Sequence, residues 1–305
     1  MPAAESRPPC GLLNLDKPIG LTSRDVVNRV AYPLKKAKVK VGHAGTLDPL
    51  ASGVLVVAVG PATRLIEQVQ RRPKSYAATI LLGATSDTLD ADGAVTPVPD
   101  APVPSADAVR SALASQVGEV EQMPPAYSAL RVGGKRAYDL AREGRAVDLA
   151  PRRVRIDRVA LVRYEWPHLE IEVDCGSGTY IRSIARDVGE ALGCGGLIAA
   201  LRRTRIGPFL VEDALPPDPD RLTAETIPGL LRPALDAVDD LPRLSLTPEQ
   251  EALVRLGRPL GLASGVGPPA EPGEVALLGP DGLLVALAEA DPGSGLYRPR
   301  RVLAG

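Results

Sequence analysis

The carboxylate of Asp48 stands in a setting that suits chemistry. Asp48 immediately precedes Pro49 in the string VGHAGTLDPLASGVL, where repeated glycines indicate a loop. A carboxylate fixed on such a loop can serve as a nucleophile or as a base. Taken alone, the string also fits an ordinary Asp-Pro turn without a chemical role, and this is the simpler interpretation.

Other motifs in the chain fail on spacing. Gly176 and Gly178 follow a predicted strand, but Ile181 stands where a dinucleotide fingerprint has its third glycine. Residues 129–136 lack both the first glycine and the final Ser or Thr of a P-loop. The three cysteines form no C-x-x-C pair and lie far from both histidines in sequence, so we expect no metal site and no disulfide framework.

Positive charge gathers in the first two thirds of the chain. Residues 1–210 carry 28 Lys and Arg against 22 Asp and Glu, whereas residues 211–305 carry 8 against 15. The acid-free segment Arg29–His43 contains Lys35, Lys36, Lys38 and Lys40. Such a cluster can bind the phosphates of a nucleic acid, and it can equally be a solvated surface.

Local patterns predict the elements around Asp48. Thr22 and Asp25 form a capping box ahead of an apolar valine face, which predicts a helix. The aliphatic run Val54–Val59 behind the loop predicts a buried strand. Residues 61–70 are expected to form a helix, and Ser75–Leu82 a strand.

Later segments add a pair of strands, VRIDRVALVRYEW and LEIEVDC, and a helix after the turn GSG. The apolar residues Ile181, Ile184, Val188 and Leu192 recur at helical spacing in that last segment. Strands and helices therefore mix without a strict βαβ repeat, which predicts an α+β fold on a mixed sheet.

After Phe209 the chain becomes rich in acids and prolines, and residues 210–242 are expected to form a connector with one short helix. A second unit begins where Thr247 caps a helix that has Pro248 at its first position. The string GEVALLGPDGLLVALAEA then predicts a hairpin. The expected domains are residues 10–235 and a small β-rich module at residues 242–305.

Five strings in order give the chain a family likeness from about Gly11 to Phe209. They are GLLNLDKPIGLTS, VGHAGTLDPLASGVL, KSYAATILLGATSDTLDADG, PPAYSALRVGGKRAYDLAREG and GSGTYIRSIARDVGEALGCGGLIAALRRTRIGPF. With them the chain resembles the TruB family of tRNA pseudouridine synthases. The resemblance implies a pseudouridine-synthase-type fold, with a mixed, largely antiparallel β-sheet flanked by helices and a C-terminal PUA-like RNA-binding module.

The resemblance also implies roles for individual residues. Asp48 matches the catalytic aspartate, Arg182 the arginine that pairs with it, and Tyr76 the tyrosine that stacks on the target base and is a candidate for removing its C5 proton. Further residues match positions that bind the substrate or support the site: His43, Tyr180, Leu201 and Lys17. His43 is a candidate for filling the space that the flipped base leaves in the RNA.

The implied reaction turns a uridine of the tRNA T loop, at position 55, into pseudouridine. It breaks the C1'–N1 bond and rejoins the ring through C5 without net redox change, so no cofactor is expected. Asp48 could act as the nucleophile or as a base on the ribose, and the sequence leaves both open. The uridine must leave its stack, and this costs a few kcal/mol that stacking on an aromatic ring partly returns.

Other arginines are candidates for holding phosphates. Arg202, Arg203 and Arg205 lie beside Leu201, although a surface cluster explains them almost as well. In the acidic C-terminal unit we expect at most an auxiliary RNA contact, through Arg298, Arg300 and Arg301.

Two other functions compete with the isomerase. A non-catalytic tRNA-binding chaperone would need only the basic surface. An N-glycoside hydrolase usually needs a second carboxylate, and none is evident near Asp48 in the sequence.

The expected partner is the T arm of tRNA, with no obligatory protein partner and a monomeric chain. The longest unbroken aliphatic run has six residues, Val54–Val59, far short of the ~20 that cross a bilayer. The N-terminus has no basic segment followed by an apolar one. We therefore expect no contact with a membrane and a cytoplasmic location.

Overall fold

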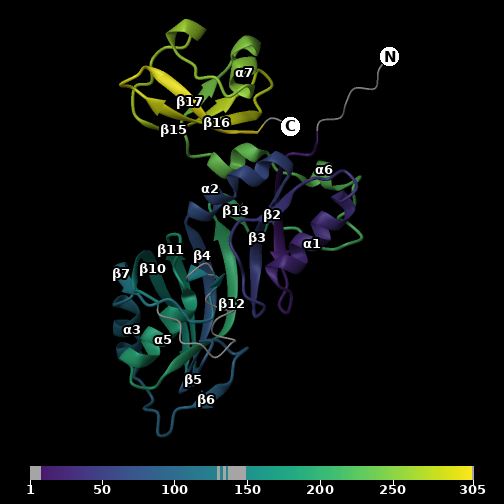
Figure 1. The fold of residues 1–305 in the computed structure, drawn as a ribbon. Coiled ribbons are helices and arrows are strands. Elements are labelled where there is room, and N and C mark those ends of the chain that lie inside the picture. Colours follow the sequence, from purple (N-terminus) through teal and green to yellow (C-terminus); the bar gives the residue numbers. More distant parts are fainter. Residues whose placement is uncertain (1–7, 129–130, 133–134, 137–148, 304–305) are drawn as a thin grey trace.

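The first two thirds of the chain build one mixed sheet. The computed structural model describes residues 8–128, 131–132, 135–136 and 149–303 (Figure 1). In this described part, nine strands form the sheet, and neighbours run antiparallel except β3 with β12. The order is β1 (Gly11–Lys17), β3 (Ala51–Val59), β12 (Gly196–Ile206), β4 (Lys74–Leu82), β11 (His168–Cys175), β10 (Arg152–Glu165) and β7 (Gly118–Gln122), with β2 (Val41–His43) beside β3 and β13 (Phe209–Leu210) beside β12.

Two helices cover the half of the sheet that ends at β7. They are α3 (Ala106–Ala114) and α5 (Ile181–Ala191), which lie together on that half (Figure 1). The apolar side of α5 is buried in one core with the sheet, where Ile184 and Val188 meet Ile80 of β4 and Ile171 of β11. This packing holds α5 against the middle of the sheet.

Helical segments cover both faces of the other half. On one face, α1 (Ser23–Leu34) packs Val26 and Val30 into a core with Leu13 of β1 and Leu55 of β3. On the opposite face lie the 3-10 helix η1 (Gly60–Leu65) and α2 (Ile66–Arg71), in a core that includes Val56. Strand β3 is therefore buried along its whole length.

Most predicted elements are present. The capping box of Thr22 and Asp25 is formed at the start of α1, and the strands β3, β4, β10 and β11 and the helix α5 lie where the patterns indicated. The helix expected over residues 61–70 is 3-10 up to Leu65 and α-helical only afterwards. Strand β12 was not predicted, because its arginine-rich second half reads as a surface segment although the strand lies between β3 and β4.

Short elements complete this domain. Two pairs of strands form small hairpins outside the main sheet, β5 (Ala84–Ser86) with β6 (Val95–Pro97) and β8 (Arg131–Val132) with β9 (Lys135–Arg136). In the described part of the chain, no helix is long and apolar enough to cross a membrane.

The predicted connector is an integral part of the domain. It contains the short helix that was expected, α6 (Ile227–Leu230), and a 3-10 helix, η2 (Ala234–Val238). Its backbone continues the edge of the sheet, because Leu215 N–H donates to Asn14 at 2.9 Å and Arg232 N–H donates to Leu12 at 2.8 Å. Strand β1 is thus paired on both sides.

The C-terminal module is a second, smaller sheet, as predicted. Its four strands follow the order β14 (Arg243–Ser245), β15 (Gly273–Leu278), β16 (Leu284–Asp291) and β17 (Leu296–Val302). The helix α7 (Pro248–Arg255) starts with the predicted capping box of Thr247 and Gln250, and η3 (Leu262–Ser264) follows it. Strands β15 and β16 form the predicted hairpin.

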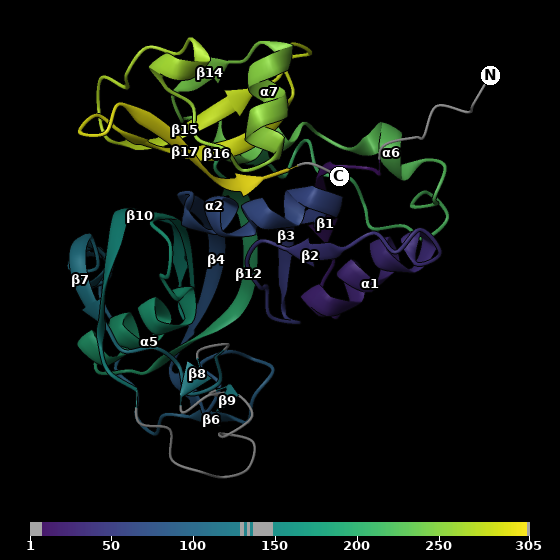
Figure 2. The same cartoon turned by 45° about the horizontal axis from the view of Figure 1, so that its top comes forward.

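The module lies over α2 of the larger domain (Figure 2), and the ion pairs Arg301–Glu67 and Arg71–Glu274 join the two. Arg301 of β17 contacts Glu67 of α2 at 2.6 Å and Glu274 of its own module at 3.1 Å. Gln68 of α2 donates to the same Glu274. Arg301, a candidate for an auxiliary RNA contact, thus joins the two domains in this structure. Arg300 is likewise paired, with Glu289.

A glycine in α5 provides a test of how this helix packs against the start of β12. A Cβ at Gly189 would lie 2.3 Å from the backbone of Gly195 and Gly196, where the chain turns into β12. Gly189→Ala should therefore lower the free energy of unfolding by about 2 kcal/mol, the usual cost of overpacking. Gly229→Ala is the control, because no atom lies within 4 Å of that Cβ position. Urea denaturation measures both variants, and a Gly189→Ala protein as stable as the control would contradict the packing.

Candidate active site

A groove of about 470 Å³ opens between the Asp48 loop, α2 and the start of α5. Its walls come from segments that are far apart in sequence, namely the loop before β3, β4, β12 and α5. The groove brings together five of the residues that the sequence singled out: Asp48, Tyr76, Tyr180, Arg182 and Leu201.

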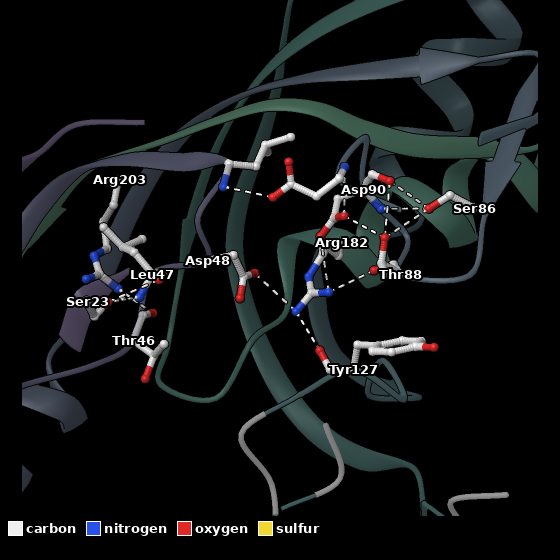
Figure 3. A network of polar contacts seen from close by, with 12 residues as sticks. Ser23, Thr46, Leu47, Asp48, Ser86, Thr88, Asp90, Tyr127, Arg182 and Arg203 are labelled. Atoms are coloured by element: carbon white, nitrogen blue, oxygen red, sulfur yellow. Dashed lines mark hydrogen bonds and ion pairs between the residues drawn. The ribbon is translucent and has the colours of Figure 1, made fainter. Parts of the chain in front are cut away.

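Arg182 is the centre of the polar network at this groove (Figure 3). Its Nη2 lies 3.1 Å from Asp48 Oδ2, and its Nη1 lies 3.2 Å from Asp90 Oδ2. The same guanidinium donates to the carbonyls of Thr88 and Tyr127, both at 2.8 Å. The Arg182 side chain is only 7% exposed, whereas that of Asp48 is 39% exposed. The arginine therefore lies behind the aspartate, and the free side of the Asp48 carboxylate faces the groove.

Asp90 is a part of the network that the sequence did not reveal. It lies in a string with three acids, SDTLDADG, where nothing in the spacing singles out one of them. Its carboxylate is buried, accepts from Thr88 Oγ1 at 2.6 Å and from Asp92 N–H at 3.2 Å, and has a pKa raised by burial. A second carboxylate thus lies close to Asp48, but it is not among the described residues that line the groove.

Buried polar groups hold the Asp48 loop from below. Ser23 Oγ accepts from Leu47 N–H at 2.8 Å and donates to Leu47 O at 3.1 Å. Arg203, 2% exposed, donates to Val54 O at 2.8 Å and to Gly45 O at 3.1 Å. The prediction that Arg203 holds phosphates is therefore wrong, because its buried guanidinium donates to backbone carbonyls of the loop and of β3.

Models of known protein families match the part of the chain that lines the groove. Residues 33–181 match the TruB family pseudouridylate synthase (N terminal domain), and residues 182–227 match the tRNA pseudouridylate synthase B C-terminal domain. The chain belongs to the TruB family. A tRNA pseudouridine synthase B of Gluconacetobacter diazotrophicus is 47% identical over 260 residues, 84% of each chain. One of Mycobacterium sp. (strain KMS) is 44% identical over 288 residues, 92% of this chain and 93% of that one.

Solved structures agree with the fold of this TruB chain. A Cbf5-Nop10-Gar1 complex contains a chain with a TM-score of 0.69 and 28% identity, over 96% of this chain and 84% of that chain. An H/ACA RNP bound to a substrate RNA containing 2'-deoxyuridine gives a TM-score of 0.69 at 26% identity, over 97% and 85%. The predicted pseudouridine-synthase fold is confirmed, and the C-terminal β-rich module is present.

Tyr76 is held at the base of the groove in this TruB chain. Its side chain is 8% exposed, and burial raises the pKa of its phenol while the neighbouring Arg203 acts in the opposite direction. A neutral phenol donates a hydrogen bond well and abstracts a proton poorly. This environment favours the stacking role predicted for Tyr76 over removal of a proton.

Lys17, which was predicted to bind the substrate or support the site, is completely buried. Its Nζ donates to Leu21 O at 2.6 Å and to Pro18 O at 3.0 Å, with Pro49 O at 3.5 Å. Loss of water lowers its pKa to about 8. Lys17 thus supports the loop that carries Asp48 and Pro49.

The remaining predicted residues differ in their positions. Tyr180 is the N-cap residue of α5, and the Arg152 guanidinium lies 4.5 Å from the centre of its ring. His43 pairs with Val57 at the end of β2 and is not among the described residues that line the groove. In the part of the chain that the structure describes, no cluster of His, Cys, Asp and Glu could hold a metal ion.

Substitution of Arg182 tests the network. Arg182→Met should lower kcat on the order of 10³-fold and change the Kd for RNA only a few-fold, because it loses a contact at the reacting site. It should also lower the free energy of unfolding by about 3 kcal/mol, since it leaves Asp90 charged, buried and unpaired. Adding Asp90→Asn should restore stability but not turnover. Equal losses in kcat and in affinity would show that Arg182 binds RNA instead.

The buried ammonium of Lys17 predicts a pH dependence of stability. Its folded-state pKa, about 8, lies below the unfolded value of 10.5, so the unfolded chain binds more protons between these values and stability rises with pH. The stability of the wild type relative to Lys17→Met should grow on the order of 2 kcal/mol from pH ~7 to pH ~10. Denaturant unfolding of both proteins across this range measures the difference. A difference that stays constant with pH would contradict the buried ammonium.

Proposed function

We propose that this chain isomerises a uridine of the tRNA T loop, at position 55, to pseudouridine. The observation that carries the proposal is the contact of Arg182 with Asp48 at 3.1 Å, inside a groove that also contains Tyr76. The relatives named tRNA pseudouridine synthase B, at 44–47% identity over most of the chain, support tRNA as the substrate.

The reaction needs a group that handles the sugar and a site that holds the loosened ring. The C1'–N1 bond breaks and a C1'–C5 bond forms; C5 loses a proton to solvent and N1 takes one up. No electron leaves or enters the substrate. The chain must therefore supply a fixed carboxylate, a surface for the ring and a site that holds the uridine outside the RNA stack.

Asp48 supplies the carboxylate. Its free oxygen faces the groove, and Arg182 fixes the other oxygen from behind. In this position Asp48 can attack the sugar or the ring, or take a proton from the ribose, and Arg182 stabilises the charged carboxylate needed at the start of each route.

Tyr76 and Leu201 supply the surface for the flipped ring. They lie on the neighbouring strands β4 and β12 and both line the groove. Stacking a base on a tyrosine returns about 1–3 kcal/mol, which is comparable to the cost of flipping it. Tyr180 closes the same groove from the start of α5.

The part of the RNA that lies outside the groove needs a positively charged protein surface. The predicted lysine cluster is exposed on the turn between α1 and β2, consistent with contact to phosphates: Lys35, Lys36, Lys38 and Lys40. A related solved structure is bound to a substrate RNA containing 2'-deoxyuridine. We assign the T arm as the partner, residues 10–235 as the catalytic domain and residues 242–305 as a PUA-like module, in a chain that acts as a monomer.

Two other functions remain as outcomes of the test. A hydrolase would release free uracil and would need a second carboxylate at the substrate. The carboxylates that line the groove in the described residues are Asp48 and Glu67, and Glu67 is paired with Arg71 and Arg301. A tRNA chaperone would bind and remodel the T arm without changing its uridines.

Replacement of Asp48 tests the proposal directly. Asp48→Asn should lose turnover on the order of 10³-fold or more while RNA affinity changes little, since the amide can neither attack nor accept a proton. Release of tritium from tRNA labelled at uridine C5 measures turnover, and filter binding measures affinity.

The control is Asp107→Asn, which alters a carboxylate on α3 whose side chain is 91% exposed and is expected to keep full activity. Full turnover of Asp48→Asn would refute the proposal. Free uracil as the product would indicate the hydrolase, and binding without tritium release by the wild type would indicate the chaperone.

A further inference from the structure

The start of α5 lacks the side-chain cap that α1, α3 and α7 have. Tyr180 is its N-cap residue, and the Tyr180 side chain makes no capping hydrogen bond. A helix N-terminus exposes up to four backbone N–H groups, so its position depends on partners from elsewhere. This terminus matters because it carries Tyr180 and Arg182, which both line the groove.

Gln122, the last residue of β7, supplies the missing partner. Its Oε1 accepts from Tyr180 N–H at 2.8 Å, and its Nε2 donates to Tyr180 O at 3.1 Å. The side-chain amide therefore pairs with both backbone groups of one residue, as a neighbouring strand would. Gln122 is 2% exposed, so water does not compete for these bonds.

The residue after Gln122 extends the attachment. Met123 O accepts from Ser183 Oγ at 2.8 Å and from Arg186 Nη2 at 3.1 Å, on the first two turns of α5. Gln122 itself is paired with Arg152 in the β7–β10 ladder, and Arg152 covers the ring of Tyr180. The sheet edge thus fixes both the backbone and the ring of Tyr180.

We infer that Gln122 is a positioning residue for the isomerisation, which sets the start of α5 so that Arg182 meets Asp48 and Tyr180 lines the groove. Gln122 is not among the described residues that line the groove, so it acts through its neighbours. The inference rests on the proposed function. A loss of the Gln122 amide should leave RNA binding intact and slow the reaction, because the reacting groups shift relative to one another.

The first test replaces the amide by an apolar side chain of similar length. Gln122→Met should lower the single-turnover rate of pseudouridine formation by ~10- to 100-fold, while the KM for tRNA stays within about twofold, since small misplacements cost rate and not binding. Gln68→Met is the matched control: Gln68 is also buried, at 7% exposure, and its amide bonds Glu274 of the C-terminal module. The control should keep the wild-type rate.

Gln122→Glu gives a readout that packing alone would not produce. The carboxylate can still accept from Tyr180 N–H, but it can donate to Tyr180 O only when protonated. Burial beside a carbonyl raises the pKa of such a glutamate. The rate of pseudouridine formation by Gln122→Glu, relative to wild type, should therefore recover as the pH falls from about 8 to about 5.5. Gln122→Met should show no recovery relative to wild type.

Three results separate the possibilities. A wild-type rate for Gln122→Met overturns the inference, and so does a Gln122→Glu rate whose ratio to wild type is the same at every pH. If Gln122→Met does not fold, the pH series of Gln122→Glu decides alone. If the wild-type protein forms no pseudouridine in tRNA, the proposed function fails instead, and the same assay shows it.

Discussion

A buried guanidinium shared between two carboxylates holds the site together. Arg182 would cost several kcal/mol to bury alone, but two carboxylates and two carbonyls compensate its charge. The four partners come from three segments: the Asp48 loop, the turn that carries Thr88 and Asp90, and the stretch after β7 that carries Tyr127. The guanidinium therefore joins three segments at the groove, and only Asp48 among its charged partners remains accessible.

The sheet makes this arrangement rigid. Strands β3, β12 and β4 lie side by side, and they bring the end of the Asp48 loop, Leu201 and Tyr76 to one surface. Two further buried cations, Lys17 and Arg203, bond backbone carbonyls beneath the loop. The loop is thus fixed by charged groups from below and by Arg182 from the side, so that the free carboxylate oxygen has little freedom of its own.

Local patterns predicted much of this from the sequence. Capping boxes, aliphatic runs and the turn before α5 located most of the elements, and the family strings predicted that Asp48 and Arg182 meet. The rest depended on tertiary contacts. Asp90 has no local mark that distinguishes it from Asp87 or Asp92. Arg203 lies in an arginine-rich stretch that is typical of a surface, and it is buried only because β12 lies inside the sheet. The family strings marked Lys17 as a residue that binds the substrate or supports the site, but no local pattern shows that its ammonium donates to backbone carbonyls.

The proposed reaction requires that the Asp48 carboxylate, held by Arg182, faces the sugar and the ring of a flipped uridine. A crystal structure of the protein with a T-arm stem-loop tests it most directly. We predict that the target uridine lies in the groove with C1', C2' or a carbon of its ring about 3.5 Å or less from an Asp48 oxygen, the distance of a reactive contact, while Arg182 still contacts Asp48. A uridine that stays stacked in the RNA loop, or one that binds with Asp48 turned away from its sugar and ring, would contradict the account.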